Sequence, residues 1–191
     1  MRIIAGEFRG RALKAPKGSN TRPTTDRVRE ALFSALASAR GGLDGAIVLD
    51  AFAGSGALSF EALSRGAAAA HLFERDRAAL AALEGNVRAL GLSANVARVH
   101  RRDVLKNPPI SARPPFDLVF LDPPYAFEAA DVLGMVAQLA AAGALADDAL
   151  VVYEHAAPSG DSVDSAAAEL GFALASRKKY GDTVVDILRR A

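Results

Sequence analysis

The fold of this chain is decided by residues 46–56, AIVLDAFAGSG, in which an apolar run ends at Asp50 and leads into a glycine-rich turn. The run from Ala46 to Leu49 has the length and composition of a buried strand, and residues 57–64 follow the pattern of a helix. Gly54 and Gly56 allow a tight turn and a close approach of a ligand to the backbone. The stretch therefore predicts a strand–turn–helix unit of an α/β fold with a ligand at the turn.

The same alternation of strands and helices continues along the chain. After the first unit, strands are expected at 70–73, 95–100, 116–121 and 149–154, and helices at 77–90, 128–142 and 163–170. Residues 172–180 and 183–188 are typical of two strands joined at a tight turn, which predicts an antiparallel hairpin. We therefore expect a Rossmann-like, seven-stranded, mostly parallel sheet with a C-terminal antiparallel hairpin.

The N-terminal segment differs from the rest in charge. Nine Lys/Arg and three Asp/Glu give residues 1–40 a net charge of +6, whereas the whole chain carries +1. Glycines interrupt residues 1–17 in a way that predicts a small hairpin, and a helix begins near Thr25 or Asp26. We expect a basic hairpin or arm at residues 1–20 that faces a polyanion, followed by one domain at residues 21–191. A solvated basic surface is the alternative interpretation.

Several classes of protein are excluded by what the chain lacks. Its 191 residues contain no Cys, which removes disulfides, thiolate metal sites and cysteine nucleophiles. No apolar run approaches the ~18 residues that span a bilayer, and the N-terminus does not resemble a signal peptide, so we expect a cytoplasmic protein. The histidines His71, His100 and His155 show no metal-ligand spacing, and no metal is expected.

Acidic residues end four successive predicted strands: Asp50, Glu74, Asp103 and Asp122. In an open α/β sheet, ligands bind beyond the carboxyl ends of the strands, so we expect these acids to surround one site. Glu74 follows Asp50 by twenty-four residues, where a carboxylate can accept both hydroxyls of a ribose. The chain has no third glycine for a dinucleotide and no phosphate-binding GxxxxGK[ST] loop. An adenosyl cofactor without phosphates fits these residues best.

The sequence Asp122-Pro123-Pro124-Tyr125 is the most specific motif in the chain. Two prolines stiffen the loop and remove two N–H groups, which leaves carbonyl oxygens as the backbone partners. A carboxylate, a carbonyl and an aromatic ring on one rigid loop suit a flat group that carries an amine. We expect Asp122 and the Pro123 carbonyl each to accept one N–H while Tyr125 stacks on the ring.

These motifs together resemble the class I S-adenosylmethionine-dependent methyltransferases that act on amino groups. The N-terminal stretches RIIAG at 2–6, RGR at 9–11 and RPTTDRVREALF at 22–33 resemble one branch of that class, the RsmD-type methyltransferases. The resemblance runs nearly from end to end. It implies methyl transfer from S-adenosylmethionine to the N2 amine of guanine 966 in 16S ribosomal RNA, either free or within an assembling small subunit.

The resemblance also implies a role for each motif residue. The turn from Gly54 to Gly56 would contact the methionine part of the cofactor, and Glu74 would bind the ribose. Asp103 would accept from the adenine amine, with Val104 beside the ring. The remaining expected site residues are Asp50 and Phe52 for the cofactor, Asp122, Pro123 and Tyr125 for catalysis, and Arg9, Arg11, Lys14 and Arg22 for RNA.

Two alternatives remain open from the residues themselves. An amino-methyltransferase of this type could instead act on DNA adenine or on a protein glutamine amide. The basic N-terminal segment favours a nucleic acid over a protein, and 191 residues leave little room for a DNA-recognition domain. A non-catalytic RNA-binding module is the alternative from a different class, and the intact Asp122–Tyr125 motif argues against it.

Overall fold

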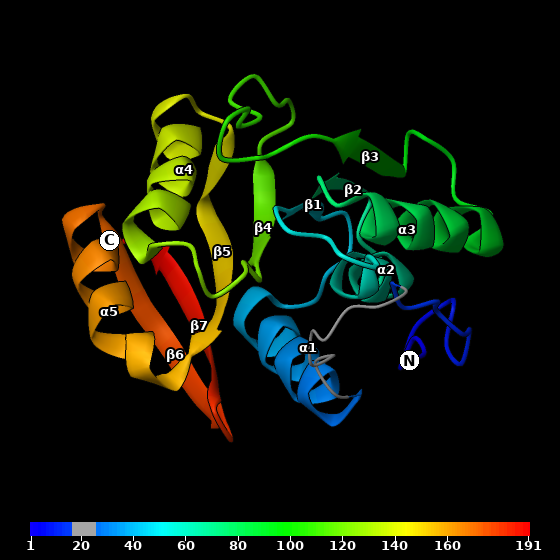
Figure 1. Cartoon of the computed structure of the whole chain (residues 1–191), viewed down its shortest axis with the longest axis horizontal. Coiled ribbons are helices and arrows are strands. Elements are labelled where there is room, and N and C mark those ends of the chain that lie inside the picture. Colours follow the sequence, from blue (N-terminus) through cyan, green and yellow to red (C-terminus); the bar gives the residue numbers. More distant parts are fainter. Residues whose placement is uncertain (17–25) are drawn as a thin grey trace. The chain divides into compact units, whose positions relative to one another are not determined.

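The computed structural model describes residues 1–16 and 26–191 and contains two compact units, Met1–Arg102 and Asp103–Ala191. The first unit holds three parallel strands in the order β3-β2-β1. The order of its elements is α1 (Asp26–Arg40), β1 (Ile47–Asp50), α2 (Ala57–Ser64), β2 (Ala69–Glu74), α3 (Arg77–Leu90) and β3 (Ala97–Arg101). Helix α2 packs on β1 and β2, and α3 packs on β3 (Figure 1).

Local sequence signals set the helix ends in this unit. Asp76 precedes α3 and its carboxylate accepts from the Ala79 N–H at 2.8 Å, which satisfies one unpaired donor of the first turn. Gly91 ends the same helix with a φ of 71°, a conformation that glycine adopts without strain. The buried residues of α3 share one face and include Leu83 and Leu90.

The second unit holds four strands in the order β4-β5-β7-β6. Its elements are β4 (Phe116–Leu121), α4 (Ala129–Ala141), β5 (Leu145–Ala156), the 3₁₀ turn η1 (Ala157–Ser159), α5 (Gly160–Glu169), β6 (Phe172–Tyr180) and β7 (Thr183–Arg190). Strands β4 and β5 are parallel, whereas β7 runs antiparallel to both β5 and β6. Helices α4 and α5 lie side by side and pack on β5 and β6 (Figure 1).

The observed elements follow the predicted alternation, and the C-terminal hairpin is confirmed. Helix α5 begins three residues before its predicted start, at Gly160, and the start of β5 differs most from the prediction. Strand β5 begins at Leu145 instead of residue 149, because a bulge in its pairing with β4 lets Phe116 pair with Leu145. The predicted N-terminal hairpin is present and short: Arg2 and Ala12 form an antiparallel bridge, and the N–H groups of Ile3, Gly10 and Leu13 donate to the carbonyls of Arg11, Ile3 and Met1.

The expected boundary between residues 20 and 21 falls among residues 17–25, outside the described part of the chain, and stays a prediction. Within residues 1–16 and 26–191, each helix is too short or too polar to cross a bilayer.

Candidate active site

The turn after β1 uses its two glycines for different purposes. Gly56 has a φ of 84°, and a Cβ there would lie 2.4 Å from Phe60 and 2.6 Å from Leu83. Gly56 is therefore required by packing beneath the turn. Gly54 has a φ of 56°, and a Cβ there would meet no atom within 4 Å. The Cα side of Gly54 is thus open to a ligand, while a contact between Gly56 and the cofactor stays a prediction.

Glu74, at the end of β2, is held in place by the backbone. Its Oε2 accepts from the Gly54 N–H at 2.9 Å, and its Oε1 accepts from the N–H groups of Arg75 and Asp76, both at 2.7 Å. A carboxylate has about four acceptor positions. Three backbone bonds therefore fix Glu74 and leave it able to accept one further donor, such as a hydroxyl.

The Asp50 side chain, at the end of β1, points toward helix α2. The side chain is buried and its Oδ2 accepts from the Ser59 hydroxyl of α2 at 2.8 Å. Burial raises the pKa of Asp50 to about 7; the Ser59 hydrogen bond opposes this rise and the charge of Glu74 adds to it. A backbone hydrogen bond with Phe52 also favours the ionised form. The observed contacts join the strand end to the turn and α2, and direct cofactor contacts of Asp50 and Phe52 stay predictions.

A second group of expected residues lies at the start of the second unit. Asp103 begins a turn in which its Oδ1 accepts from the Leu105 N–H at 3.0 Å. The Val104 side chain is buried. These contacts do not test the expected roles of Asp103 and Val104 at the adenine ring, which stay predictions.

The Asp122–Tyr125 loop follows β4 directly. Asp122 and Pro124 are exposed, Pro123 is buried, and Tyr125 is 72% exposed. The Pro124 carbonyl accepts from the Phe127 N–H at 3.0 Å, which closes a turn. Among residues 1–16 and 26–191, no group donates to the Pro123 carbonyl. The loop thus presents a carboxylate, an open carbonyl and an uncovered aromatic ring.

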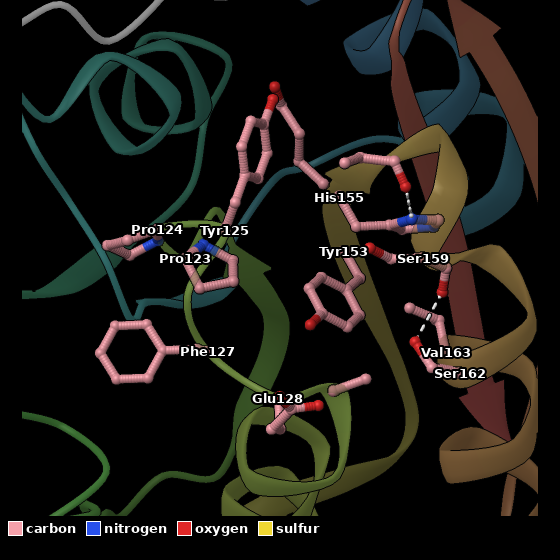
Figure 2. Close-up of a pocket in the computed structure, with 13 residues that line it drawn as sticks. Pro123, Pro124, Tyr125, Phe127, Glu128, Tyr153, His155, Ser159, Ser162 and Val163 are labelled. Carbon is pink, nitrogen blue, oxygen red and sulfur yellow. Dashed lines mark hydrogen bonds between the residues drawn. The ribbon is translucent and has the colours of Figure 1, made fainter.

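A pocket lies against this loop within the second unit. The loop lines one side, and the end of β5 and the start of α5 line the other. Figure 2 shows the Tyr153 ring among these residues, with Pro123 and Tyr125 on one side of it and Ser162 and Val163 on the other. The cavity is about 150 Å³, small for a drug-sized ligand and suited to a single flat ring.

Tyr153 forms part of the pocket wall and remains a phenol at neutral pH. Burial, with a smaller contribution from the charge of Glu128, raises the pKa of Tyr153 to about 12. The Tyr153 ring also meets His155 edge-on, with the ring centroids 5.5 Å apart.

Behind the pocket wall, His155 belongs to a network of alternating charges. Its Nε2 donates to Asp186 at 3.0 Å. Its Nδ1 lies 2.9 Å from the Ala156 carbonyl (Figure 2). Both partners only accept, so this pair of contacts favours the doubly protonated imidazolium form of His155. Burial lowers the pKa of His155, but the hydrogen bonds to Asp186 and Ala156 outweigh it and the net pKa is raised. Arg177 binds Asp186 at 2.7 Å and also Asp164, which ties β5, β6, β7 and α5 together.

The comparisons with known proteins agree with one another. The profile of the family described as Conserved hypothetical protein 95 matches residues 1–189. Ribosomal RNA small subunit methyltransferase D of Escherichia coli K12 is 37% identical over 97% of this chain and 94% of its own length. The Haemophilus influenzae protein of the same name is 42% identical over 69% of this chain and 67% of its own.

The chain belongs to the ribosomal RNA small subunit methyltransferase D family.

Solved structures of relatives support the same fold. A structure described as a putative methyltransferase, yhhF, from E. coli covers 100% of this chain and 97% of its own, with 38% identity and a TM-score of 0.79. A ribosomal protein L11 methylase from Lactobacillus delbrueckii, at 20% identity and a TM-score of 0.66, shares the fold alone. The predicted class I methyltransferase fold is thereby confirmed.

The N-terminal arm of this family member is anchored to two helices of the first unit. Glu61 in α2 is fully buried, and its carboxylate accepts from the N–H groups of Ile4 at 2.8 Å and Ala5 at 3.1 Å. The Ser64 hydroxyl accepts from the Phe8 N–H at 2.9 Å. Gly6 packs so closely that a Cβ would lie 1.7 Å from the Ser64 carbonyl. These bonds add to the backbone pairing of the short hairpin itself, in which the Ile3 N–H donates to the Arg11 carbonyl at 3.0 Å.

Asn86 in α3 joins the arm to the glycine-rich turn. It is buried, exchanges backbone hydrogen bonds with Lys14 at 2.8 and 3.0 Å, and donates to the Ser55 carbonyl at 2.9 Å. The sequence patterns did not single out Glu61, Ser64 or Asn86. The signal for each was a polar residue on an otherwise apolar helix face.

The arm still presents its expected cations. Arg9, Arg11 and Lys14 are exposed, although the Arg11 guanidinium donates to the Ala89 carbonyl of α3. Arg22 lies outside the described residues. Contact of these residues with RNA stays a prediction.

The other two histidines pack against each other across β2 and β3. His100 stacks on Phe73 with centroids 4.3 Å apart and on His71 at 5.3 Å. Burial lowers the pKa of both histidines, that of His71 to about 4, so both are neutral at pH 7.

Proposed function

We propose that this protein transfers a methyl group from S-adenosylmethionine to the exocyclic N2 amine of a guanine in 16S ribosomal RNA, at the guanine 966 site, during maturation of the small ribosomal subunit. The observation that carries the proposal is the Asp122–Tyr125 loop, with its carboxylate, open Pro123 carbonyl and exposed aromatic ring beside a ring-sized pocket. Support comes from the E. coli relative, which is named a ribosomal RNA methyltransferase and aligns over 97% of this chain.

The residues of the first unit fit the proposed cofactor. The Cα side of Gly54 is uncovered, and Glu74 is held with an acceptor position to spare for a ribose hydroxyl. The N-terminus of α2, which follows Gly56, favours an anionic group such as the cofactor's carboxylate. Asp103 and Val104 are proposed to bind the adenine. When bound, S-adenosylmethionine supplies a sulfonium-bound methyl carbon that an amine nitrogen attacks as the carbon–sulfur bond breaks.

The chain's own contribution to catalysis is to position the amine. The lone pair of a guanine N2 is delocalised into the ring and is a poor nucleophile. N–H bonds to Asp122 and to the Pro123 carbonyl orient this nitrogen and favour the pyramidal geometry that attack requires. Holding the reacting atoms about 3 Å apart and in line supplies most of the acceleration. The proton that N2 loses passes to Asp122 or to water.

The target base must leave its helix to reach the loop. Tyr125, at 72% exposure, offers a ring on which the base can stack. The anchored arm, with Arg9, Arg11 and Lys14, is proposed to bind the phosphates that flank the base. A ribosomal substrate places the protein in the cytoplasm.

The experiment is methyl transfer from tritiated cofactor to small-subunit particles isolated from cells that lack this protein, followed by nucleoside analysis. We expect N2-methylguanosine in the 16S RNA. Free 16S RNA, duplex DNA and a glutamine-containing protein are assayed in parallel. Label in N6-methyladenine or in a protein, with none in guanosine, would replace the proposal by one of the alternative amino-methyltransferase activities. Absence of transfer to every acceptor, with the cofactor bound, would favour an RNA-binding module.

A further inference from the structure

The sheet register places a second carboxylate next to Asp122. The parallel pairing of β4 and β5 ends with Phe120 opposite Val152 and Leu121 opposite Tyr153. The residues that follow Leu121 and Tyr153 are Asp122 and Glu154. Neighbouring strands lie about 4.8 Å apart, and side chains alternate between the two faces of a sheet. Glu154 therefore follows Asp122 on the same face, one strand away.

Glu154 also lines the pocket that borders the Asp122–Tyr125 loop, and it is partly buried there. The next residue, His155, has both ring nitrogens occupied by Asp186 and the Ala156 carbonyl. The His155 ring therefore bonds to Asp186 and Ala156 and offers no ring nitrogen to a ligand in the pocket. The carboxylate that β5 contributes to the pocket is that of Glu154.

Two adjacent carboxylates match one edge of one base. Guanine carries the N2 amine and the N1–H on the same edge, bonded to the same ring carbon, so it offers two neighbouring donors. Adenine and cytosine carry an amine whose ring neighbour is a nitrogen with a lone pair. A second carboxylate would therefore accept the N1–H of guanine and would repel the ring-nitrogen lone pair of adenine or cytosine. Carboxylates on neighbouring strands also repel each other, and a pair of donors placed between them reduces that repulsion.

We propose that Glu154 selects guanine by accepting the N1–H of the target base while Asp122 accepts its N2 amine. The inference rests on the proposed function and deepens it. Glu154 is a specificity residue in this assignment, whereas Asp122 and Pro123 position the nucleophile. The discrimination is expected from the charge at Glu154, because an ionised acceptor forms a stronger bond to N1–H and repels a lone pair more strongly than an amide does.

The test uses the base analogue 2-aminopurine, which has the N2 amine but a lone pair at N1. Small-subunit particles are reconstituted with 16S RNA that carries guanine or 2-aminopurine at the target position. We expect the wild type to prefer guanine in kcat/KM by at least about tenfold. Glu154→Gln should lower that ratio at least about tenfold, because its amide can donate to the N1 of 2-aminopurine. Glu154→Asp should keep the preference at a lower rate.

Two variants of α4 serve as comparisons. Asp131→Asn removes an exposed acid in the first turn of α4 that does not line the pocket, and it should keep the wild-type ratio. Glu128→Gln makes the same chemical change at another acid of the pocket lining. The assignment is overturned if Glu128→Gln lowers the ratio and Glu154→Gln does not, or if the wild type methylates both bases equally well. In both cases methylation of guanine N2 by the wild type leaves the proposed function intact. A wild type inactive on guanine N2 overturns both.

Discussion

At the scale of single residues, the ends of the neighbouring strands β1 and β2 hold two carboxylates with opposite environments. Glu74 is half-buried and accepts three backbone N–H groups, whereas Asp50 is buried against α2 with a pKa raised to about 7. An acid whose folded pKa exceeds its unfolded value of 3.8 favours the folded state when protonated. The ionised Asp50 therefore costs stability as pH rises from about 4 to about 7. Glu74, fixed in position, is the better candidate for binding a ligand.

We predict that Glu74→Ala weakens cofactor binding about 10- to 100-fold. The variant would lose a charge-assisted hydrogen bond to the ribose, which contributes roughly 1.5–3 kcal/mol. Isothermal titration with S-adenosylmethionine measures the affinity, and a thermal melt shows whether the variant is folded. Glu84→Ala, in α3, is the control and should bind as the wild type does. A folded Glu74→Ala protein with unchanged affinity would remove Glu74 from the site.

Asp122→Ala is predicted to lower the single-turnover rate by at least about 100-fold, because the amine loses one of the two acceptors that orient it. Cofactor affinity should change much less, since the Asp122 carboxylate is assigned to the second substrate. Single-turnover methylation of small-subunit particles, measured beside cofactor titration, separates the two effects. A near wild-type rate in this variant would show that Asp122 does not hold the amine.

At the scale of elements, the N-terminal arm is an anchored structure. Its backbone is bonded to Glu61 and Ser64 in α2 and to Asn86 in α3, and Asn86 also bonds to the Ser55 carbonyl in the glycine-rich turn. Anchoring lowers the conformational entropy that binding would otherwise cost. The same contacts connect the arm to the turn that is proposed to hold the cofactor.

We predict that replacing Arg9, Arg11 and Lys14 by Ala weakens binding to RNA of any sequence. The slope of log affinity against log salt should flatten by up to about 0.7 for each phosphate that the variant no longer neutralises. Filter binding across a range of salt concentrations measures both quantities, and cofactor affinity should stay unchanged. Removal of Lys178 and Lys179, which are exposed on β6, is the charge control. Equal slopes and intercepts for the triple variant and the wild type would favour the solvated-surface interpretation.

At the scale of the whole molecule, the His155–Asp186–Arg177–Asp164 network is an alternating set of charges that joins three strands and a helix of the second unit. Burial raises the pKa of Asp186, but its hydrogen bonds with Arg177 and His155 outweigh burial and the net pKa is lowered. The stability that Asp186 contributes is therefore present above its unfolded pKa and is lost as pH falls through its folded pKa. His155 has the opposite sign, because its folded pKa is raised.

His155→Gln is predicted to destabilise the protein most below pH 6.5. A histidine with a raised folded pKa contributes fully below its unfolded pKa and loses that contribution as pH rises through the folded pKa. A hydrogen bond between charged groups contributes about 1.5–3 kcal/mol, which corresponds to a drop of several degrees in Tm at pH 6. Thermal melts of both proteins at pH 6 and pH 9 measure the difference. A Tm difference that is the same at both pH values would rule out an imidazolium at this position.

The sequence by itself determined the elements and the motif residues. Strong apolar periodicity and clear end signals predicted α3 at residues 77–90 with both bounds as observed, and β4 and β6 likewise. The Asp122–Tyr125 motif was recognisable because its chemistry is contained in four consecutive residues. Such features depend on residues that are close in the chain, so local conformational preferences are enough to predict them.

Only the tertiary structure decided which polar groups lie together when their positions are far apart in the chain. The bonds from Ile4 to Glu61 and from Lys14 to Asn86 join residues 57 and 72 positions apart, and they hold the N-terminal hairpin on α2 and α3. The pairing of His155 with Asp186 and the register that sets Glu154 beside Asp122 have the same origin. The sequence shows that a helix face carries a buried polar residue. The partner that satisfies it is chosen by packing, because an unpaired polar group in the core costs more than any local preference can offset.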